Sequence, residues 1–375
     1  MAKENKPRMH YMDLLKGIAI FMVVMGHVLT FCIRDIDAAT IFKIIGEVHM
    51  PIFFFISGWF TYKATADGRI RRPDLRRRAM QLIVPMVIVS TLWVLQFPYS
   101  GLRSPMAPGF EGLWTSEYKN GYWFTPVLFV IMALYALLAP VILRWRRPAL
   151  AITASIAISL ALYAVIAHFV PIKYIGITSA LLILQFLPIF MAGAIARQHQ
   201  DDFMRLIANP RAVTLAILAG IPLFYIAVWP WRIPALENIP FIVPTAKMLF
   251  QLALAIVAMN IAVPWSETAY APGRTRPGRL AVIWEYLGRK SLAIYLLHYF
   301  FLFPLTFLQQ PARDMALSIV PLAVIAAAIA ACIIAVTLAA EYLLSRSPLT
   351  ARLICGNYNT ISPKQQQQQQ QQQKQ

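Results

Sequence analysis

The sequence has 375 residues, of which 59% are hydrophobic and 13% are charged, and its mean hydropathy is +0.60. Because a soluble domain carries about 25% charged residues, this composition excludes a soluble globular protein and leaves no polar block for a second domain. The formal net charge is +18, but the basic residues lie between apolar runs, which indicates membrane topology rather than nucleic-acid binding. The three cysteines have no paired spacing and indicate neither a disulfide framework nor a metal site.

Ten apolar runs follow along the chain, and each is long enough for a helix that crosses the hydrocarbon core, which needs about 20 residues. We therefore predict an all-α polytopic membrane protein, a bundle of about ten transmembrane helices within a membrane domain of residues 1–356. A disordered, glutamine-rich tail is expected over 357–375. The expected helices lie near 14–33, 42–62, 80–97, 123–143, 149–169, 177–196, 212–231, 241–263, 288–308 and 316–344.

The distribution of lysine and arginine predicts the orientation of these helices. With a cytoplasmic N-terminus, 25 of the 34 basic residues lie on the cytoplasmic side, 8 lie outside, and Lys16 lies within the first helix. The cytoplasmic loops of membrane proteins carry the excess of lysine and arginine. Both termini are therefore expected in the cytoplasm.

Ionisable side chains within the first two helices mark a candidate reaction centre. His27 lies thirteen residues into the first run, roughly 20 Å from its cytoplasmic end. Glu47 and His49 lie roughly 8–11 Å below the outer end of the second run, which is a matching depth. Because ionisable residues inside a membrane are costly and usually functional, we assign all three to catalysis. The alternative is that each packs against a neighbouring helix or faces interfacial water.

Basic residues at the cytoplasmic ends form a second candidate site. Lys16 precedes His27 by eleven residues, roughly 16 Å along one helix. Arg77 and Arg78 belong to the arginine-rich segment 69–78, most of which topology explains. Lysine and arginine also bind phosphate groups, and coenzyme A is a cytosolic anion with several phosphates. Beside the topological explanation, these three basic residues are therefore compatible with an anion site, for which coenzyme A is a candidate ligand.

Two later stretches add further candidates. The run YWFTPVLF opens the fourth helix and places Trp123 at the outer interface, where aromatic residues belong in any membrane protein. The run LGRKSLAIYLLH leads into the ninth helix and places Ser291, Tyr295 and His298 on one helix face.

Four stretches, in their order and spacing, resemble the successive signatures of the membrane acyltransferase-3 family: YMDLLKGIAIFMVVMGHV, HMPIFFFISGWF, YWFTPVLF and LGRKSLAIYLLH. The resemblance covers nearly the whole chain, and the family's ten-helix core matches the ten runs. The family's first signature has a basic residue, ten further residues and a histidine, here Lys16 and His27. Lysine in place of the usual arginine, with glycine before the histidine, resembles the branch of fucose 4-O-acetylase-like glycan O-acetyltransferases. Where the family often has two spaced arginines, this chain has Arg77 and Arg78, then Gln81.

The resemblance implies acyl transfer from a coenzyme A thioester, usually acetyl-CoA, to a hydroxyl of a cell-surface carbohydrate or its lipid-linked precursor. It places the family's essential histidine on His27. It also implies an integral protein of a bacterial inner membrane that uses no metal. We assign Tyr295 and His298 to the donor site, and Ser57 and Trp123 to the acceptor site.

These assignments predict a channel with two entrances. A neutral His27 takes the proton of the attacking hydroxyl or carries the acyl group as a covalent relay, two alternatives that the sequence leaves open. Glu47 is expected to orient His27, and Lys16 to bind coenzyme A phosphate at the cytoplasmic mouth. A donor to the tetrahedral intermediate is expected from His49, Ser57 or Tyr295. The acceptor enters from outside, where segment 98–122 either folds over the entrance or simply connects two helices.

Two other classes of protein are compatible with the same pattern. A secondary transporter also has buried ionisable groups and prolines within its helices, although the sequence has no evident internal repeat. A membrane scaffold without chemistry leaves the matched depths of His27 and His49 unexplained.

Overall fold

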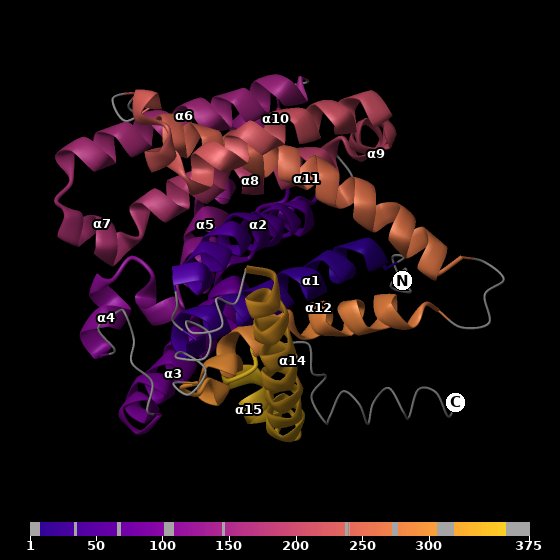
Figure 1. Ribbon diagram of the computed structural model, residues 1–375. Helices are drawn as coiled ribbons and strands as arrows, with labels where there is room; N and C mark the ends of the chain where they lie inside the picture. The colour runs from indigo at the N-terminus through magenta and orange to yellow at the C-terminus, as the bar shows by residue number, and fades with distance from the viewer. Residues whose placement is uncertain are drawn as a thin grey trace.

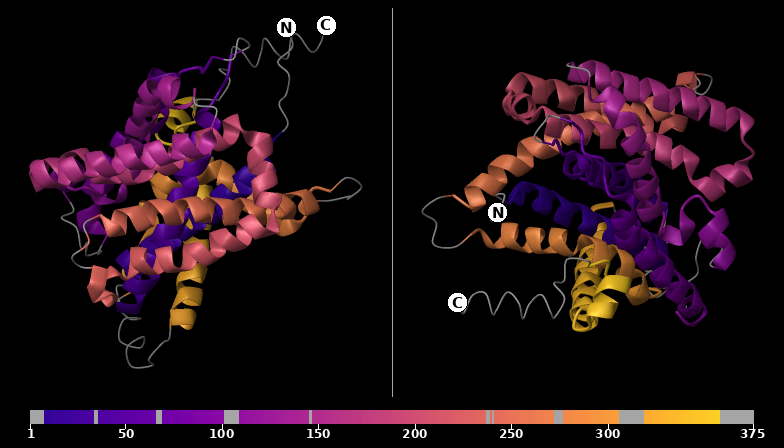
Figure 2. Two further views of the ribbon diagram at one scale, coloured as in Figure 1. Left: turned by 90° about the horizontal axis from the view of Figure 1, so that it is seen from above. Right: turned by 180° about the vertical axis from the view of Figure 1, so that it is seen from behind.

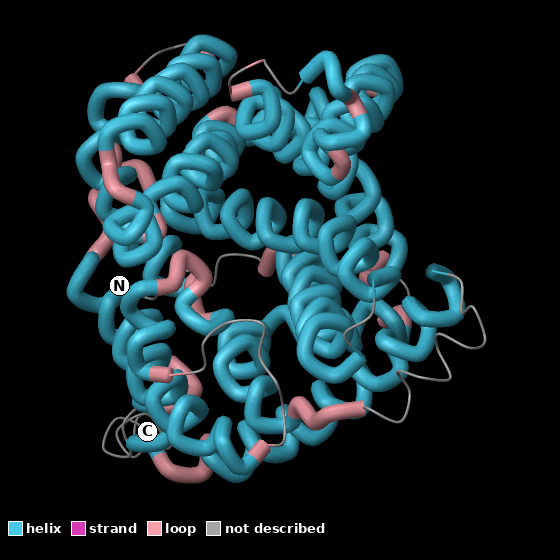
Figure 3. Tube along the Cα trace, turned by 60° about the vertical axis from the view of Figure 1, so that its left-hand side comes forward, coloured by secondary structure: helices cyan, strands magenta, loops and turns pink. Residues whose placement is uncertain are grey.

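Helices make up nearly all of the described chain. The computed structural model describes residues 8–33, 36–65, 69–100, 109–144, 147–236, 239, 241–271, 277–305 and 319–357. Figure 3 shows helices joined by short connections, and the only extended pairing within these ranges is an isolated bridge between Ala64 and Ile70. The prediction of an all-α membrane protein is confirmed, whereas the tail from 358 onward lies outside the described residues.

Ten long helices are present within these ranges. They are α1 (His10–His27), α2 (Ile36–Thr61), α3 (Leu75–Gln96), α5 (Phe124–Ile142), α6 (Pro148–Phe169), α8 (Ala180–Gln198), α10 (Pro210–Val228), α11 (Ile242–Ala269), α12 (Arg279–Leu297) and α14 (Ile319–Leu344). Four short helices lie between or after them: α4 (Phe110–Thr115), α7 (Ile172–Thr178), α9 (Gln200–Ala208) and α15 (Pro348–Leu353).

Nine of the long helices in the described ranges have the length and apolar composition of a membrane span. The tenth, α12, does not, because its first twelve residues include four charged side chains: Arg279, Glu285, Arg289 and Lys290. The expected ninth helix, 288–308, therefore begins nine residues late. In the structure the helix starts at Arg279, ends at Leu297 and continues as a 3-10 turn over His298–Phe301.

α1 lies at the centre of the bundle and packs against α2, α11, α12 and α14, most extensively against α12. Figures 1 and 2 show α6, α8, α10 and α11 gathered on one side of α1 and α2, with α3, α12 and α14 on the other side. Two helices that carry candidate residues, α1 and α2, thus lie between these groups, whereas the first half of α12 has exposed side chains such as Leu280 and Ile283. α6 and α10 lie at the periphery, since only 17% of the apolar window of each is buried.

Glycines bring α1 and α12 into backbone contact. A Cβ atom on Gly17 would lie 1.8 Å from the carbonyl oxygen of Trp284, and one on Gly288 would lie 1.8 Å from that of Asp13. No side chain fits between the helices at this crossing. Small residues allow the same close approach between helices in membranes generally, where dispersion contacts replace the hydrophobic effect.

The crossing of α2 and α8 depends in the same way on Gly58 and Gly193, and we expect Gly193→Ala to destabilise the fold. A Cβ on Gly193 would lie 2.0 Å from the carbonyl oxygen of Phe55, so the helices must move apart, at a typical cost of about 1–3 kcal/mol. The melting temperature of the purified protein in detergent should fall.

Gly220→Ala in α10 is the matched control for this substitution. Its Cβ would meet only the Cβ of Ala253, at an ordinary distance of 3.6 Å, and alanine favours a helix over glycine by up to about 1 kcal/mol. Gly220→Ala should therefore leave the melting temperature unchanged or raise it. Equal melting temperatures for the two variants would contradict the close crossing of α2 and α8.

Candidate functional site

His27 lies where the first helix changes its winding. α1 ends at this residue, and the next six, Val28–Ile33, form a π-helix, a rare segment that is frequent at functional sites. The side chain is half-buried. Its Nδ1 atom lies 2.7 Å from Nε2 of His298, and its Nε2 atom lies 2.9 Å from the hydroxyl of Tyr299. Both ring nitrogens of His27 therefore have defined partners.

The direction of these hydrogen bonds follows from a backbone carbonyl. Nδ1 of His298 lies 2.8 Å from the carbonyl oxygen of Ile294, and because a carbonyl only accepts, this nitrogen carries the hydrogen. In a neutral His298, Nε2 is then an acceptor, so Nδ1 of His27 donates to it. Nε2 of His27 keeps its lone pair and accepts from Tyr299. The network thus presents Nε2 of a neutral His27 as the basic atom.

His298 belongs to this network rather than to a donor site. The residue is fully buried in the turn that follows α12, and its ring joins His27 to the backbone of α12. A general base whose second nitrogen is held by another group is the arrangement found in hydrolytic triads. His298, which was expected at the donor site, thus contacts His27 and is not among the residues that line the inner cavity.

Glu47 and His27 do not form the expected contact. The carboxylate of Glu47 lies 2.5 Å from the ammonium of Lys247 on α11, while His298 and Tyr299 take the two nitrogens of His27. The ion pair joins α2 to α11 across an outer cavity. Glu47 thus lines this cavity in an ion pair with Lys247 and does not contact the His27 ring nitrogens.

His49 and His27 lie near each other and line the same outer cavity, at the matching depth that the sequence indicated. Nδ1 of His49 donates to the carbonyl oxygen of Ile45, 2.5 Å away, so in the neutral ring Nε2 is an acceptor. Such a nitrogen suits the hydroxyl of a ligand. It does not suit the expected role of donating to an oxyanion.

The outer cavity has a volume of about 430 Å³. His27 and His49 lie in its walls, together with the Glu47–Lys247 pair and Trp123. Its aromatic and polar walls also include Tyr118, Gln185 and Trp231. Trp123, which was expected at the acceptor site, thus lines the same cavity as His27, Glu47 and His49.

The end of the outer segment 98–122 forms part of this cavity, since Tyr118 and Gly121 line it. A buried ammonium fixes this segment. Nζ of Lys119 lies 2.8–3.1 Å from four carbonyl oxygens, those of Trp114, Ser116, Gly176 and Ile177, and shares its three hydrogens among them. Burial lowers the pKa of this lysine. The end of the segment therefore forms part of the wall of the outer cavity, and residues 101–108 lie outside the described residues.

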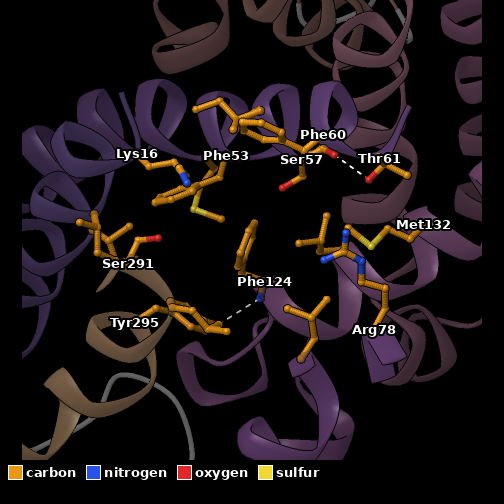
Figure 4. A pocket seen from close by; sticks show the side chains of 17 residues that line it. Lys16, Phe53, Ser57, Phe60, Thr61, Arg78, Phe124, Met132, Ser291 and Tyr295 are labelled. Atoms are coloured by element: carbon orange, nitrogen blue, oxygen red, sulfur yellow. Dashed lines mark hydrogen bonds between the residues drawn. The ribbon is translucent and has the colours of Figure 1, made fainter. Parts of the chain in front are cut away.

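A second, inner cavity of about 270 Å³ lies between α1, α2, α3, α5 and α12. Figure 4 shows Lys16 and Arg78 extending into it from different helices, with Ser57, Thr61 and Ser291 among apolar neighbours. Ser57 was expected at the acceptor site. It lies here instead, eight residues and roughly 12 Å along α2 from His49.

The structure separates the two arginines of the expected donor site. Arg78 lines the inner cavity, and its guanidinium donates to the side-chain oxygen of Gln81 at 3.2 Å. Arg77 is exposed and is not among the residues that line this cavity. Lys16 also lines the cavity, and its ammonium lies 2.6 Å from the carboxylate of Asp13. Lys16 and Arg78, without Arg77, therefore provide the positive charge of the cavity.

Val23, Met50 and Tyr295 line both cavities, and we call this set the neck. Tyr295 was expected at the donor site and as a possible oxyanion donor. Its hydroxyl donates to the carbonyl oxygen of Gly121 at 3.1 Å and accepts from the amide of Phe124 at 3.2 Å. Its single hydrogen is therefore already engaged, and Tyr295 forms a wall between the cavities.

The sequence interpretation missed two residues of the site, Tyr299 and Lys247. Tyr299 follows His298 directly and is 1% exposed, but an aromatic residue near the end of a span usually marks the interface. Lys247 was counted as an outer basic residue. A lysine five residues inside α11 is an intramembrane charge, and its depth could have indicated a partner on α2.

Within the part of the chain that the structure describes, no group of three or more His, Cys, Asp or Glu side chains could hold a metal ion.

Comparison with known proteins identifies relatives. A family model described as an acyltransferase domain matches residues 9–340. Nodulation protein NolL of Mesorhizobium japonicum is 33% identical over 139 residues, which are 34% of this chain and 35% of that protein. Nodulation protein NolL of Sinorhizobium fredii is 33% identical over 138 residues, 33% of this chain and 34% of that protein. The chain thus matches about a third of the length of these relatives, and no solved structure matches it significantly.

Proposed function

Because this integral membrane protein belongs to the acyltransferase-3 family, whose model matches most of the chain, we propose that it transfers an acetyl group from acetyl-CoA to a carbohydrate hydroxyl. The acceptor is a cell-surface carbohydrate or its lipid-linked precursor. The protein acts in the bacterial inner membrane, where cytosolic acetyl-CoA reaches the inner cavity and the acceptor reaches the outer one.

One observation carries the proposal: two cavities meet at the neck, beside the hydrogen-bonded ring of His27. The inner cavity has cationic groups at Lys16 and Arg78, which suit the phosphates of coenzyme A. Its remaining walls are mostly apolar and suit the pantetheine arm. The outer cavity exposes His27 and His49. The thioester and the hydroxyl would thus meet at His27 from opposite sides.

The network around His27 supports direct transfer. The acceptor hydroxyl replaces the Tyr299 hydroxyl at Nε2 of His27, which takes its proton as the oxygen attacks the thioester carbon. His298 holds the opposite nitrogen and stabilises the imidazolium. The displaced Tyr299 hydroxyl donates to the tetrahedral oxyanion. As the carbon–sulfur bond breaks, the imidazolium returns the proton to the thiolate, which leaves as coenzyme A.

The outer cavity supports a polyhydroxyl acceptor. The indole rings of Trp123 and Trp231 offer flat apolar faces that pack against the C–H face of a sugar ring. Glu47 and His49 accept hydrogen bonds from hydroxyl groups, while Lys247 donates them. A few fixed polar groups among aromatic walls are typical of small-molecule sites.

The proposal is tested with the purified protein in lipid nanodiscs and acetyl-CoA that carries a radioactive acetyl group. Membrane extracts fractionated for glycans and lipid-linked sugars serve as acceptors. Label should appear in a carbohydrate fraction and be released by mild alkali as acetate, as an O-acetyl ester requires. If coenzyme A is never released and no fraction gains label, the proposed activity is wrong.

A further inference from the structure

The neck between the two cavities lies one helical turn from the catalytic network. Val23 precedes His27 by four residues on α1, Tyr295 precedes His298 by three on α12, and Met50 follows His49 on α2. All three neck residues are less than 10% exposed. A thioester that enters beside Lys16 and Arg78 must therefore pass the neck before it reaches Nε2 of His27.

Two of the three neck residues are held in place. Val23 is β-branched and has one strongly preferred rotamer in a helix. The Tyr295 hydroxyl is fixed at both ends, by the carbonyl of Gly121 and the amide of Phe124. These contacts also join α12 to the end of segment 98–122, which forms part of the wall of the outer cavity.

Met50 is the movable member of the neck. Its unbranched side chain has three rotatable bonds and adapts to irregular space. The residue after it is Pro51, inside α2, and a proline there removes one backbone hydrogen bond and loosens the turn. Met50 also lines the outer cavity next to His49, so an acceptor bound there touches it.

We propose that Met50 gates the neck and thereby favours transfer over hydrolysis, an inference that rests on the proposed function. With the outer cavity empty of acceptor, the Met50 side chain keeps the thioester in the inner cavity. An acceptor that binds against His49 displaces this side chain and opens the path to His27. Met50 therefore decides which nucleophile the thioester meets, a carbohydrate hydroxyl or water.

Hydrolysis of the acetyl-CoA thioester, the reaction that Met50 prevents, follows the same chemical steps as transfer. Water in the outer cavity gives a proton to Nε2 of His27 while its oxygen bonds to the thioester carbon. The carbon–sulfur bond breaks, acetic acid forms, and the imidazolium returns the proton to the thiolate of coenzyme A. The acid then loses its remaining proton to water as acetate. Exclusion of water from reactive intermediates is a general reason for closed active sites.

The test compares Met50→Ala, which widens the neck, with Met50→Leu, which keeps most of its volume. Release of free coenzyme A is followed with a thiol reagent, and transfer with radioactive acetyl-CoA and the acceptor fraction. Without acceptor, Met50→Ala should release coenzyme A about tenfold faster than the wild type, while Met50→Leu should stay near the wild-type rate. With acceptor, both variants should still transfer label.

Met191→Ala is the matched control, because Met191 is fully buried in α8 and lines neither cavity. It should keep the wild-type ratio of hydrolysis to transfer even if it lowers stability. An unchanged ratio in a folded Met50→Ala variant overturns the gate and leaves the proposed function intact. If Met50→Ala does not fold, the gate is tested with Met50→Phe, which should block transfer and hydrolysis together, and normal transfer by that variant overturns it. A wild-type protein that transfers nothing shows instead that the proposed function has failed.

Discussion

Acyl transfer is expected to fall by about 10²–10⁴-fold when His27 is replaced with alanine, because the attacking hydroxyl then has no general base. The substitution removes the nitrogen that the network holds ready, Nε2, and leaves the cavities in place. A single-turnover assay with radioactive acetyl-CoA and saturating acceptor measures the chemical step directly. Activity above a few per cent of the wild type would exclude His27 as the base.

A second substitution separates chemistry from folding. Alanine at position 27 leaves the buried Nε2 of His298 without its donor, which costs about 1–3 kcal/mol. His27→Asn supplies an amide hydrogen near the position of Nδ1 and can still donate to His298. This variant should melt close to the wild type and yet be as inactive as His27→Ala. If it kept activity, the loss in the alanine variant would be structural.

Substitutions of His298, which hydrogen-bonds His27, test the catalytic network independently. His298→Gln places an amide oxygen where Nε2 lies, so it can still accept from Nδ1 of His27. It should retain more activity than His298→Leu, which leaves that hydrogen unpaired and frees the His27 ring to rotate. The dependence of the rate on pH should also change in the leucine variant, since an imidazolium at position 27 loses its stabilising neighbour. Equal activity and equal pH profiles in the two variants would contradict a positioning role.

The helices of this protein could be predicted because apolar length alone determines a membrane span. The ninth helix was the exception. Its start was placed at 288, nine residues after its true start, and His298 then lay only ten residues inside. The helix starts at Arg279, so His298 lies roughly 28 Å along α12 and His27 lies roughly 26 Å along α1. His27 and His298 thus lie at a similar depth in the membrane, which the position of the apolar run alone could not reveal.

The sequence also indicates how deep a residue lies in the membrane, but it does not indicate which way the side chain points around the helix axis. Glu47 was matched to His27 because both lie at one level of the membrane, yet its carboxylate faces Lys247 on α11. Helix packing determines which neighbour a side chain meets, and packing here depends on close crossings at Gly17 and Gly288. Residue type and depth therefore identified the candidate residues, whereas their partners required the tertiary structure.

The KM for acetyl-CoA is expected to rise by about 10- to 100-fold in Arg78→Ala, since a hydrogen bond to a charged group contributes about 1.5–3 kcal/mol. Arg78 lines the inner cavity and carries a guanidinium fork that suits phosphate oxygens. The KM for the acceptor should stay the same, because the acceptor binds on the other side of the neck. Initial rates at varied donor and fixed saturating acceptor measure the effect.

Arg77 provides a matched control at the next position of the same helix. It has the same charge, but it is exposed and does not line the cavity, so Arg77→Ala should change the KM for acetyl-CoA by less than about twofold. A second donor tests whether the contact is to phosphate: acetyl-pantetheine has the thioester arm without the phosphates of coenzyme A. The wild type should prefer acetyl-CoA strongly, and Arg78→Ala should lose most of that preference while its rate with acetyl-pantetheine stays the same. If Arg78→Ala weakened both donors equally, the arginine would shape the cavity without binding phosphate, and Lys16 would be the remaining cation that could hold coenzyme A there.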